Sequence, residues 1–565
     1  MERTMQSTVA CNEIRGSARY VELAIFTGAL LLYGLLPSHN YHYADDSLRW
    51  AYAITQPSGL INSHHLYLNI MREIYHALHA VFGTAVEPAR LLALYSALWG
   101  AVGLVWFYRL LRILGCGAVA LPGTLACAFT TNYWAYSIVG DVYVPATALM
   151  VIGAYAFIRS LRANSYRSQV GGTLAAIVAF VLMILHHQAY SVFVIGLTAG
   201  TLFTRESIWK RRLIQSVIVL AVTGIVALAI YGVVYRATQD TETTSLRAFV
   251  SGYVDSLNAR PDQKRISLSI LANSAAGQLR ALLPYYVMFR SASVTHAIQQ
   301  RFPYRYVYPY PYLVRSLSPI DIALILVGAI VVGVAGCVLC VCGAITLLRE
   351  KDGALAILFA MFPQALFFIW WEGISDEFWI WSLPLVIMVA AKGAARGQRW
   401  GQRWPVRLLN AAVVGLFVCS LLGAILLFAN PDNDIDAVNR RYLARVSAAD
   451  MVVGFDEIQA TGRTHLAMEQ QGFLYFNVFD HSFNWSGADL AELEREIAET
   501  LARGGKIFVD SYILHPPKSH LAFIRLTNPE FDVQRQNILV HLRSVPSARI
   551  EWISQDATVP GYFVD

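Results

Sequence analysis

Charged residues are scarce in this 565-residue chain. Asp, Glu, Lys and Arg make up 15% of it, while hydrophobic residues make up 56%. Soluble globular proteins carry about 25% charged residues, so the composition excludes that class and predicts an integral membrane protein. The formal net charge of +6 implies no nucleic-acid partner, because the basic residues lie in short loops between apolar segments, where they set membrane orientation.

Other features are missing too. The seven cysteines lie mostly inside apolar runs, so there is no sign of a disulfide framework. Cys337 and Cys340 have the spacing of a redox or zinc pair, but small residues in an apolar helix explain them better. The N-terminus lacks the short apolar core and cleavage site of a signal peptide. We therefore expect the first apolar helix to be retained as an anchor.

Long apolar runs fill most of the chain. A helix that spans a bilayer needs about 20 apolar residues, and about eleven segments meet this test. They lie near residues 20–37, 89–112, 117–136, 142–160, 170–187, 189–204, 213–235, 319–348, 353–371, 377–394 and 406–429. The predicted fold is a polytopic α-helical membrane domain over residues 1–430.

The basic residues predict the orientation of these segments. With a cytoplasmic N-terminus, the cytoplasmic connections would hold most of them: Arg109, Arg112, Arg159, Arg162, Arg167, Arg205, Lys210, Arg211, Arg212, Arg349, Lys351, Lys392, Arg396, Arg399, Arg403 and Arg407. The opposite short connections hold none. An odd number of spans then places the C-terminal tail outside the cytoplasm. We expect the protein to lie in the plasma membrane, which would be the inner membrane of a bacterial cell envelope.

Acidic and histidine residues show the complementary distribution. At the extracytoplasmic ends of the predicted helices lie Asp45, Asp46, His64, His65, Asp141, His186, His187, Glu372, Asp376 and Glu377. Ionisable groups at a membrane edge are costly and usually line a functional cavity. The set therefore predicts an active site on that face. The alternative is that acidic residues are merely depleted from the basic face.

The first extracytoplasmic loop, residues 38–88, has a structure of its own. An apolar stripe recurs at helical spacing, formed by Leu66, Ile70, Ile74, Leu78 and Val81. It predicts an amphipathic helix on the membrane surface. A shorter helix is expected after Ser47, with a turn at residues 56–59, "QPSG".

Several motifs occur in a fixed order along residues 20–395. After the first apolar segment come "YADDSLRW", "QPSG" and "HHLYLNI". Then follow the aromatic and acidic-Val-Tyr run "NYWAYSIVGDVYVPATALM", the helix end "LMILHHQAY" and the late motif "WWEGISDEFWIWSLPLVIMV".

This series resembles the GT-C class of membrane glycosyltransferases, and more closely the bacterial relatives of the protein O-mannosyltransferases. The resemblance implies a GT-C-like fold and a polyprenyl-phosphate sugar donor. Two departures leave donor and acceptor open. The acidic pair is Asp-Asp instead of Asp-Glu, and "QPSGLINSHHLY" is longer and poorer in proline than the usual turn.

The resemblance implies that Asp45 is the general base, which takes the acceptor's proton during attack on the anomeric carbon. Asp46 would orient the acceptor or Asp45; an N-cap role is its alternative. The expected substrate-binding residues are His64, His65, Arg72, Asp141, Tyr143, His186, His187, Arg301, Arg305, Glu372, Glu377 and Trp379.

The leaving phosphate needs cationic or N–H donors. The candidates cannot be ranked from the sequence: Arg72, His64, His65, His186, His187, Arg280, Arg290, Arg301 and Arg305. We expect no cofactor and no metal. A divalent metal at the two histidine pairs is the alternative, and for His186 and His187 so is a hydrogen bond within the helix bundle.

The long loop at residues 236–318 ends in "RFPYRYVYPYPYLVR". Tyrosines with interleaved arginines suit sugar stacking and phosphate pairing, although an interfacial aromatic belt explains them as well. Long loops are often lids, and we expect this one to border the substrate cavity.

From residue 431 to residue 565 the pattern changes to alternating strands and helices. Strands are predicted at residues 451–455, 473–479, 506–510 and 549–554, with a capped amphipathic helix over "SGADLAELEREIAETLARGG". This predicts a soluble extracytoplasmic α/β domain. It lacks a nucleotide-binding glycine motif, so an acceptor-binding, partner-binding or purely structural role is expected.

The predicted function is transfer of a hexosyl or pentosyl group from a polyprenyl-phosphate donor to a hydroxyl of a glycan, lipid or protein. A transporter or flippase of lipid-linked glycans is one alternative. No duplicated halves with broken helices support it, and the acids lie at helix ends. A non-catalytic scaffold that binds glycans is the other.

Overall fold

The structure is a computed structural model that describes most of the chain. The described residues are 2–38, 47–57, 65–238, 268–284, 287, 291, 293, 316–373, 375–430, 443–454, 464–468, 471–478, 486–510, 513–514 and 528–553. The chain divides into two compact units. The first comprises Met1–Ser38, Gln56–Val287 and Ser318–Leu426, and the second comprises His39–Thr55, Met288–Leu317 and Leu427–Asp565.

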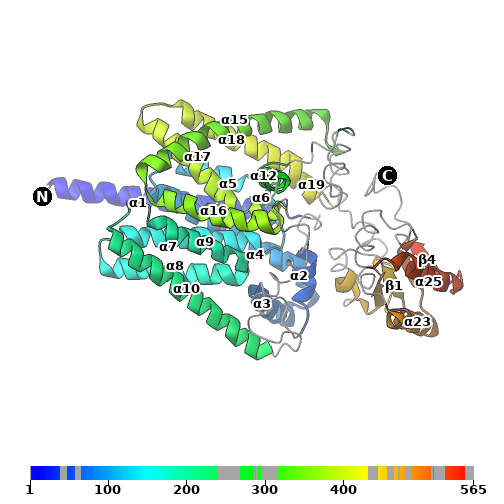
Figure 1. The fold of residues 1–565 in the computed structure, drawn as a ribbon. Coiled ribbons are helices and arrows are strands. Elements are labelled where there is room, and N and C mark those ends of the chain that lie inside the picture. The colour runs from blue at the N-terminus through cyan, green and yellow to red at the C-terminus, as the bar shows by residue number, and fades with distance from the viewer. Residues whose placement is uncertain are drawn as a thin grey trace. The chain divides into compact units, whose positions relative to one another are not determined.

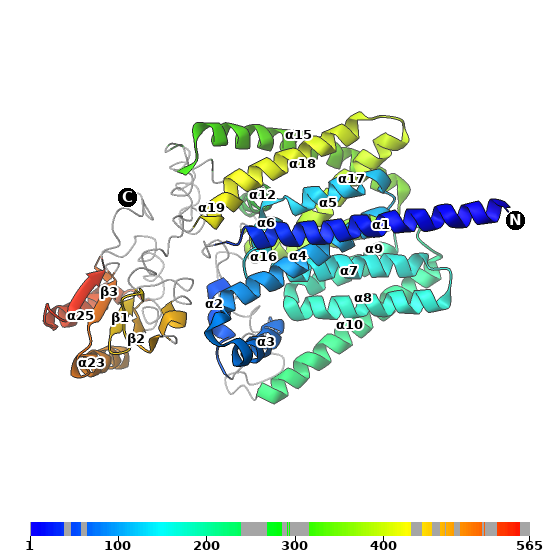
Figure 2. The same cartoon turned by 180° about the vertical axis from the view of Figure 1, so that it is seen from behind.

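The first unit is helical (Figures 1 and 2). Its helices are α1 (Glu2–Leu35), α3 (Tyr67–Phe82), α4 (Pro88–Ile113), α5 (Ala120–Ala128), α6 (Thr131–Ser137), α7 (Tyr143–Arg162), α8 (Tyr166–His186), α9 (Ser191–Thr201), α10 (Trp209–Thr238), α12 (Leu268–Leu282), α15 (Pro319–Glu350), α16 (Gly353–Glu372), α17 (Ser382–Arg399) and α18 (Trp404–Ser420). Short helical turns join them: η2 (Gly83–Ala85), η3 (Gly117–Val119), η4 (Gln188–Tyr190), η8 (Glu377–Trp379) and the π-helical η9 (Leu421–Ile425), which leads into α19 (Leu426–Ala429).

Among the described residues, seven helices are long and apolar enough to cross a membrane, so the chain is an integral membrane protein. They are α4, α7, α8, α10, α15, α16 and α18. One expected span, residues 117–136, is not a single helix. Extended backbone at Thr130 separates α5 from α6, and the Thr130 hydroxyl donates to the Cys127 carbonyl. The expected total of about eleven spans stays a prediction.

Helix α7 packs between α4 and α8, while α15 packs on α17 and α18. The α15–α17 crossing depends on two glycines. A Cβ atom at Gly343 would overlap the carbonyl oxygen of Val389, and one at Gly393 would overlap that of Leu339. Small residues allow such close backbone approach between helices in a membrane.

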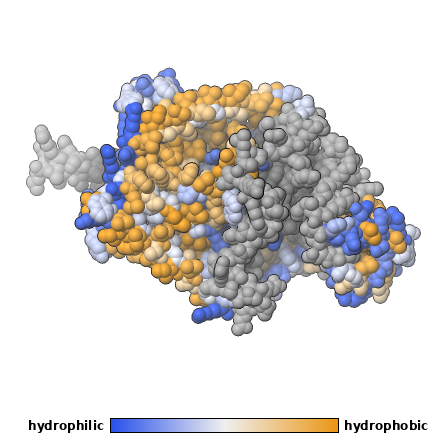
Figure 3. Space-filling model, in the orientation of Figure 1, coloured by the Kyte–Doolittle hydropathy of each residue, from blue (hydrophilic) through white to orange (hydrophobic). Residues whose placement is uncertain are grey.

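The outer surface of the helical unit is hydrophobic. Figure 3 shows a broad hydrophobic face over the helices, with hydrophilic residues gathered at the left edge of the view. Helix α15 alone exposes many large apolar side chains: Ile320, Leu324, Leu326, Val327, Ile330, Val334, Val338, Val341, Ile345 and Leu348. An exposed apolar face of this extent is the one expected to contact lipid.

One end of the bundle, where α4, α7 and α15 end, is closed by ion pairs, and we call it the clasp end. Lys392 is 1% exposed. Its Nζ lies 2.7 Å from Glu350 Oε2 and 2.5 Å from Asp352 Oδ2, and it donates to the Leu114 carbonyl at 2.8 Å. Nearby, Glu206 accepts hydrogen bonds from Arg162 and from the Gly353 N–H at the start of α16.

The second unit contains a parallel four-stranded sheet in the order β2-β1-β3-β4. The strands are β1 (Met451–Gly454), β2 (Leu474–Asn477), β3 (Ile507–Asp510) and β4 (Ile550–Ile553). Each falls within a predicted stretch. In register, Met451 pairs with Leu474 and Ile507, and Ile507 pairs with Ile550.

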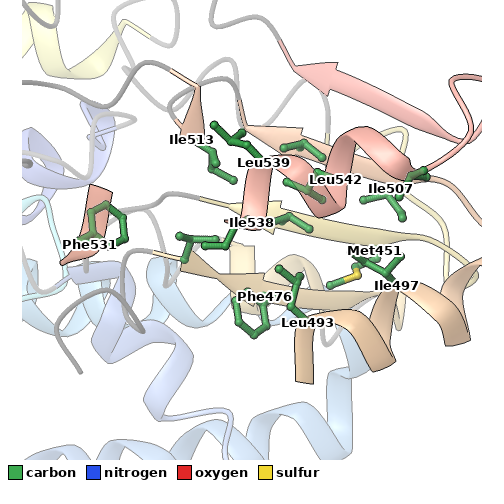
Figure 4. Packing of buried hydrophobic residues seen from close by; sticks show 14 residues of the cluster. Met451, Phe476, Leu493, Ile497, Ile507, Ile513, Phe531, Ile538, Leu539 and Leu542 are labelled. Carbon is green, nitrogen blue, oxygen red and sulfur yellow. The ribbon is translucent and has the colours of Figure 1, made fainter. Parts of the chain in front are cut away.

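Two helices, α23 (Gly487–Ala502) and α25 (Phe531–Ser544), bury their apolar sides in the core of this unit. Figure 4 shows Leu493 and Ile497 of α23 near the strand residues Met451 and Phe476, with Ile538 of α25 in the same cluster. Ser486 and Asp489 form a capping box at the start of α23, as predicted. The unit also includes α2 (Ser47–Ala53).

Replacing Lys392 with Met should destabilise the protein, because Glu350 and Asp352 would lose their shared cation. Their side chains are 27% and 18% exposed, so water screens part of the effect. We expect a loss of about 2–3 kcal/mol, below the range for breaking a fully buried pair. Thermal unfolding of the protein in detergent measures this loss. Lys210→Met, an exposed change at the start of α10, is the control. Equal melting temperatures for the two variants would contradict the stabilising role of Lys392 at the clasp end.

Candidate active site

The start of α3 is fastened to the opposite end of the bundle, which we call the imidazole end because histidines gather there. His65 Nδ1 lies 2.8 Å from the carbonyl oxygen of His186. Since a carbonyl only accepts, Nδ1 of His65 carries the proton. The ring of Tyr67 stacks on the His186 ring at 4.5 Å and 13°. The amphipathic helix that the sequence predicts is thereby attached to the end of α8.

His186 is satisfied within the bundle. Its Nδ1 donates to the carbonyl of Leu182 at 2.8 Å, and its Nε2 accepts from the hydroxyl of Tyr95 at 2.7 Å. Both ring nitrogens of a neutral imidazole are then used. Trp99 packs edge-on against the same ring. Of the two interpretations left open by the sequence, this geometry favours a histidine that hydrogen-bonds within the bundle.

His187 has a different environment. Its Nδ1 accepts from the Ala189 N–H at 3.3 Å, so the neutral ring carries its proton on Nε2 and can donate from there. Tyr143 lies 5.2 Å away between ring centroids, and His65 lies 5.1 Å away. His187 is therefore an N–H donor in an aromatic setting, which is the type of group that a developing anion needs.

Asp141 lies in the turn between α6 and α7 and is 2% exposed. The Ser96 hydroxyl, on α4, donates to the Asp141 carbonyl at 3.1 Å and accepts from its N–H at 3.3 Å. One carboxylate oxygen accepts from the Val142 N–H at 2.5 Å. A Cβ at Gly140 would overlap Leu92, so only glycine lets this turn pack so tightly on α4.

The late motif forms the connection from α16 to α17. Phe378 packs against Tyr143 and Phe368, with centroid distances of 5.8 and 5.4 Å. Trp379 donates from Nε1 to the Gly373 carbonyl at 2.7 Å. The indole nitrogen of Trp379 thus fixes the corner that brings Glu377, which is half-buried, to the imidazole end.

The structure brings together His65, Asp141, Tyr143, His186 and His187 from separate parts of the sequence. Arg72 lies on α3 and pairs with Glu73 at 3.4 Å. The other expected residues lie outside the described residues: Asp45, Asp46, His64, Arg301, Arg305 and the side chain of Glu372. Their predicted roles remain predictions.

The sequence reasoning did not find Tyr67, Tyr95, Ser96 and Trp99. Tyr95 and Trp99 are four residues apart, so they share one face of α4, and both lie near the helix start. This spacing was a usable signal, because polar aromatic residues near the end of an apolar helix tend to find a partner. Their partner, His186, is 91 residues away from Tyr95 and could not be named from the pattern.

Within the part of the chain that the structure describes, no group of three or more His, Cys, Asp or Glu side chains has the arrangement of a metal site. His65, His186 and His187 form hydrogen bonds to backbone atoms or to the Tyr95 hydroxyl. A metal at the paired histidines gains no support from these contacts.

No protein-family model matches the chain, and no curated protein matches it. Among solved structures, it is similar to ArnT from Cupriavidus metallidurans bound to undecaprenyl phosphate, with 13% identity and a TM-score of 0.48 over 82% of this chain and 86% of that chain. It is also similar to apo ArnT from the same organism, with 12% identity, a TM-score of 0.46 and the same coverage. ArnT is a GT-C glycosyltransferase, the class that the motifs resemble, but so distant a likeness carries no argument about activity.

Replacing Tyr95 with Phe should loosen the start of α3. The change removes the hydroxyl that donates to buried His186 Nε2, and an unsatisfied buried acceptor costs about 1–3 kcal/mol. Amide hydrogen exchange over residues 66–71 should become faster, because His186 anchors this segment through Tyr67 and His65. Tyr166→Phe, an exposed change at the other end of α8, is the control. Unchanged exchange in Tyr95→Phe would show that His186 does not hold α3.

Proposed function

We propose that the chain is a membrane glycosyltransferase that moves a sugar from a polyprenyl-phosphate donor to a hydroxyl acceptor at the extracytoplasmic face. The observation that carries the proposal is the convergence of His65, Asp141, Tyr143 and His187 at one end of the bundle. Buried ionisable groups at a membrane edge are costly. Among the described residues, the opposite end pairs its charges in a closed clasp, whereas this end gathers imidazole and phenol side chains near a buried carboxylate.

In the proposed reaction Asp45 is the general base. The acceptor hydroxyl gives its proton to the Asp45 carboxylate while its oxygen bonds to the anomeric carbon. The bond from that carbon to the phosphate oxygen breaks, and polyprenyl phosphate leaves with the electron pair. Asp46 would raise the pKa of its neighbour, since two adjacent carboxylates disfavour the doubly charged state.

The chain's connectivity is compatible with this role. The backbone N–H of Ser38 donates to the Ile138 carbonyl at 3.4 Å, three residues before Asp141. Asp45 follows Ser38 by seven residues, and seven residues span at most about 25 Å. Asp45 itself lies outside the described residues, so its distance from Asp141 stays part of the proposal.

The donor side requires groups that stabilise the leaving phosphate. The Nε2–H of His187 is suited to this, because it is an N–H donor buried among aromatic rings, where a hydrogen bond to an anion is stronger than in water. Tyr143 and Phe378 present aromatic faces beside it. We assign the donor's phosphate and reducing-end sugar to this region, with the acceptor entering from the solvent side.

The finer features of the proposal concern substrate and location. The transferred group is a hexose or a pentose, and the acceptor is a glycan, a lipid or a protein. The N-terminus lies in the cytoplasm, and the sheet-containing unit lies outside it, where it can bind the acceptor or a partner. Glycan and lipid mass spectrometry of cells lacking the protein would identify what is transferred.

Replacing Asp45 with Asn tests the reaction. The amide cannot take a proton, so the rate of transfer should fall by about 100-fold or more, while the affinity for the lipid donor stays close to that of the wild type. Transfer is measured with purified protein in liposomes that contain lipid-linked sugars. Glu492→Gln, a change at a half-exposed side chain on α23, is the control.

The other functions give different results in this experiment. A scaffold would show no transfer in the wild type and unchanged glycan binding in Asp45→Asn. A carrier would move the lipid-linked sugar across the bilayer without transferring it. Either result with the wild-type protein would overturn the proposal.

A further inference from the structure

An aromatic contact joins the short helix α2 to the sheet within the second compact unit. The rings of Tyr52 on α2 and His465 are stacked, with their centroids 4.7 Å apart and their planes at 19°. His465 also meets the ring of Tyr475 on β2 edge-on, at 5.1 Å and 85°. Both arrangements are among those that aromatic pairs prefer. His465 therefore connects a helix of the first long loop with a strand of the C-terminal sheet.

The position of His465 is fixed by the sheet. Residues 464–468 form a short helical turn, from which Ala467 and Met468 pack against a buried cluster that includes Val452. Side chains alternate between the two faces of a strand. Tyr475 shares this face with Val452, its partner in register, whereas helices α23 and α25 cover the other face. The turn that carries His465 is thus held in place without any contribution from α2.

Helix α2 depends on such contacts. It has seven residues, and isolated helices shorter than about 12–15 residues are marginal in water. One side of it, which includes Leu48, Trp50 and Ala51, is buried, while Tyr52 is half-buried. Apolar burial alone has no direction, whereas a stacked ring pair requires one geometry. The stack on His465 therefore adds a contact that specifies where α2 lies.

The acidic pair lies in the sequence directly before α2. The Ser38 N–H donates to the Ile138 carbonyl at 3.4 Å, so the chain is attached to the helical unit just before this segment begins. Asp46 precedes Ser47, the first residue of α2. The positions of the two carboxylates lie outside the described residues. Along the chain, however, they fall between one attachment to the helical unit and one to the sheet.

We propose that His465 is a positioning residue for the acidic pair. By holding Tyr52 it fixes the start of α2, and the backbone passes this constraint on to Asp45 and Asp46. The inference rests on the proposed function, and it gives the sheet-containing unit a part in transfer beyond binding an acceptor or a partner. Position matters for a general base, because a displacement of about 1 Å can lower a rate about 100-fold.

The test compares kcat and KM for sugar transfer by the full-length protein in liposomes that contain lipid-linked sugars. His465→Ala removes the stacked ring, so kcat should fall by about tenfold or more. The KM for the lipid-linked sugar should stay close to the wild-type value, because His465 is assigned no contact with the donor. His465→Phe keeps a ring that can stack on Tyr52 and should retain most of the wild-type kcat.

Further variants separate positioning from folding. Tyr52→Ala should lower kcat as much as His465→Ala does, and the double variant should be no slower than either, because all three lose the same contact. Amide hydrogen exchange over residues 47–53 should become faster in each of them, while exchange over β1 and β3 stays unchanged. His541→Ala, which removes a histidine that lies near Glu494 in the same unit, is the matched control and should transfer sugar like the wild type.

Wild-type kcat in both His465→Ala and Tyr52→Ala would overturn the inference, and so would an equal loss of kcat in His465→Phe and His465→Ala. Faster exchange in the strands as well as in α2 would show that His465 stabilises the whole unit and does not position α2. The proposed function fails separately, if the wild type transfers no sugar or Asp45→Asn leaves transfer unchanged. Faster exchange confined to residues 47–53 in His465→Ala would then still show that this contact holds α2.

Discussion

The cost of placing charge in a medium of low dielectric constant determines how the charged and polar side chains of the helical unit are partnered. A charge taken out of water must be paired, hydrogen-bonded or neutral. At the clasp end it is paired: Lys392 joins Glu350 and Asp352, and its third donor reaches the end of α4. At the imidazole end the contacts are mainly hydrogen bonds between neutral groups: imidazole nitrogens donate to carbonyls or accept from a hydroxyl. The need to partner buried polar groups is thus met by ion pairs at the clasp end and by neutral hydrogen bonds at the imidazole end.

This difference decides which end suits a reaction. A network of full charges that satisfy one another is rigid, and opening it would expose several of them at once. Neutral imidazoles and hydroxyls can accept or donate a proton without breaking an ion pair. His186 shows how such a group becomes structural, since both of its ring nitrogens are hydrogen-bonded. The neighbouring His187 accepts from a backbone N–H through Nδ1 and lies among the rings of His65, Tyr143 and Tyr190.

The sequence predicted the features that depend on local periodicity. The seven described spans, the α3 stripe and the four strands follow from patterns of period 3.6 or 2. The break at Thr130 was missed, because neither proline nor glycine marks it; the signal that was available is the change from small apolar residues before it to the polar and aromatic run "TNYWAYS" after it. The separate roles of His186 and His187 were also beyond prediction. They depend on contacts with Tyr95 and with the Ala189 N–H, which only the packed fold brings into place.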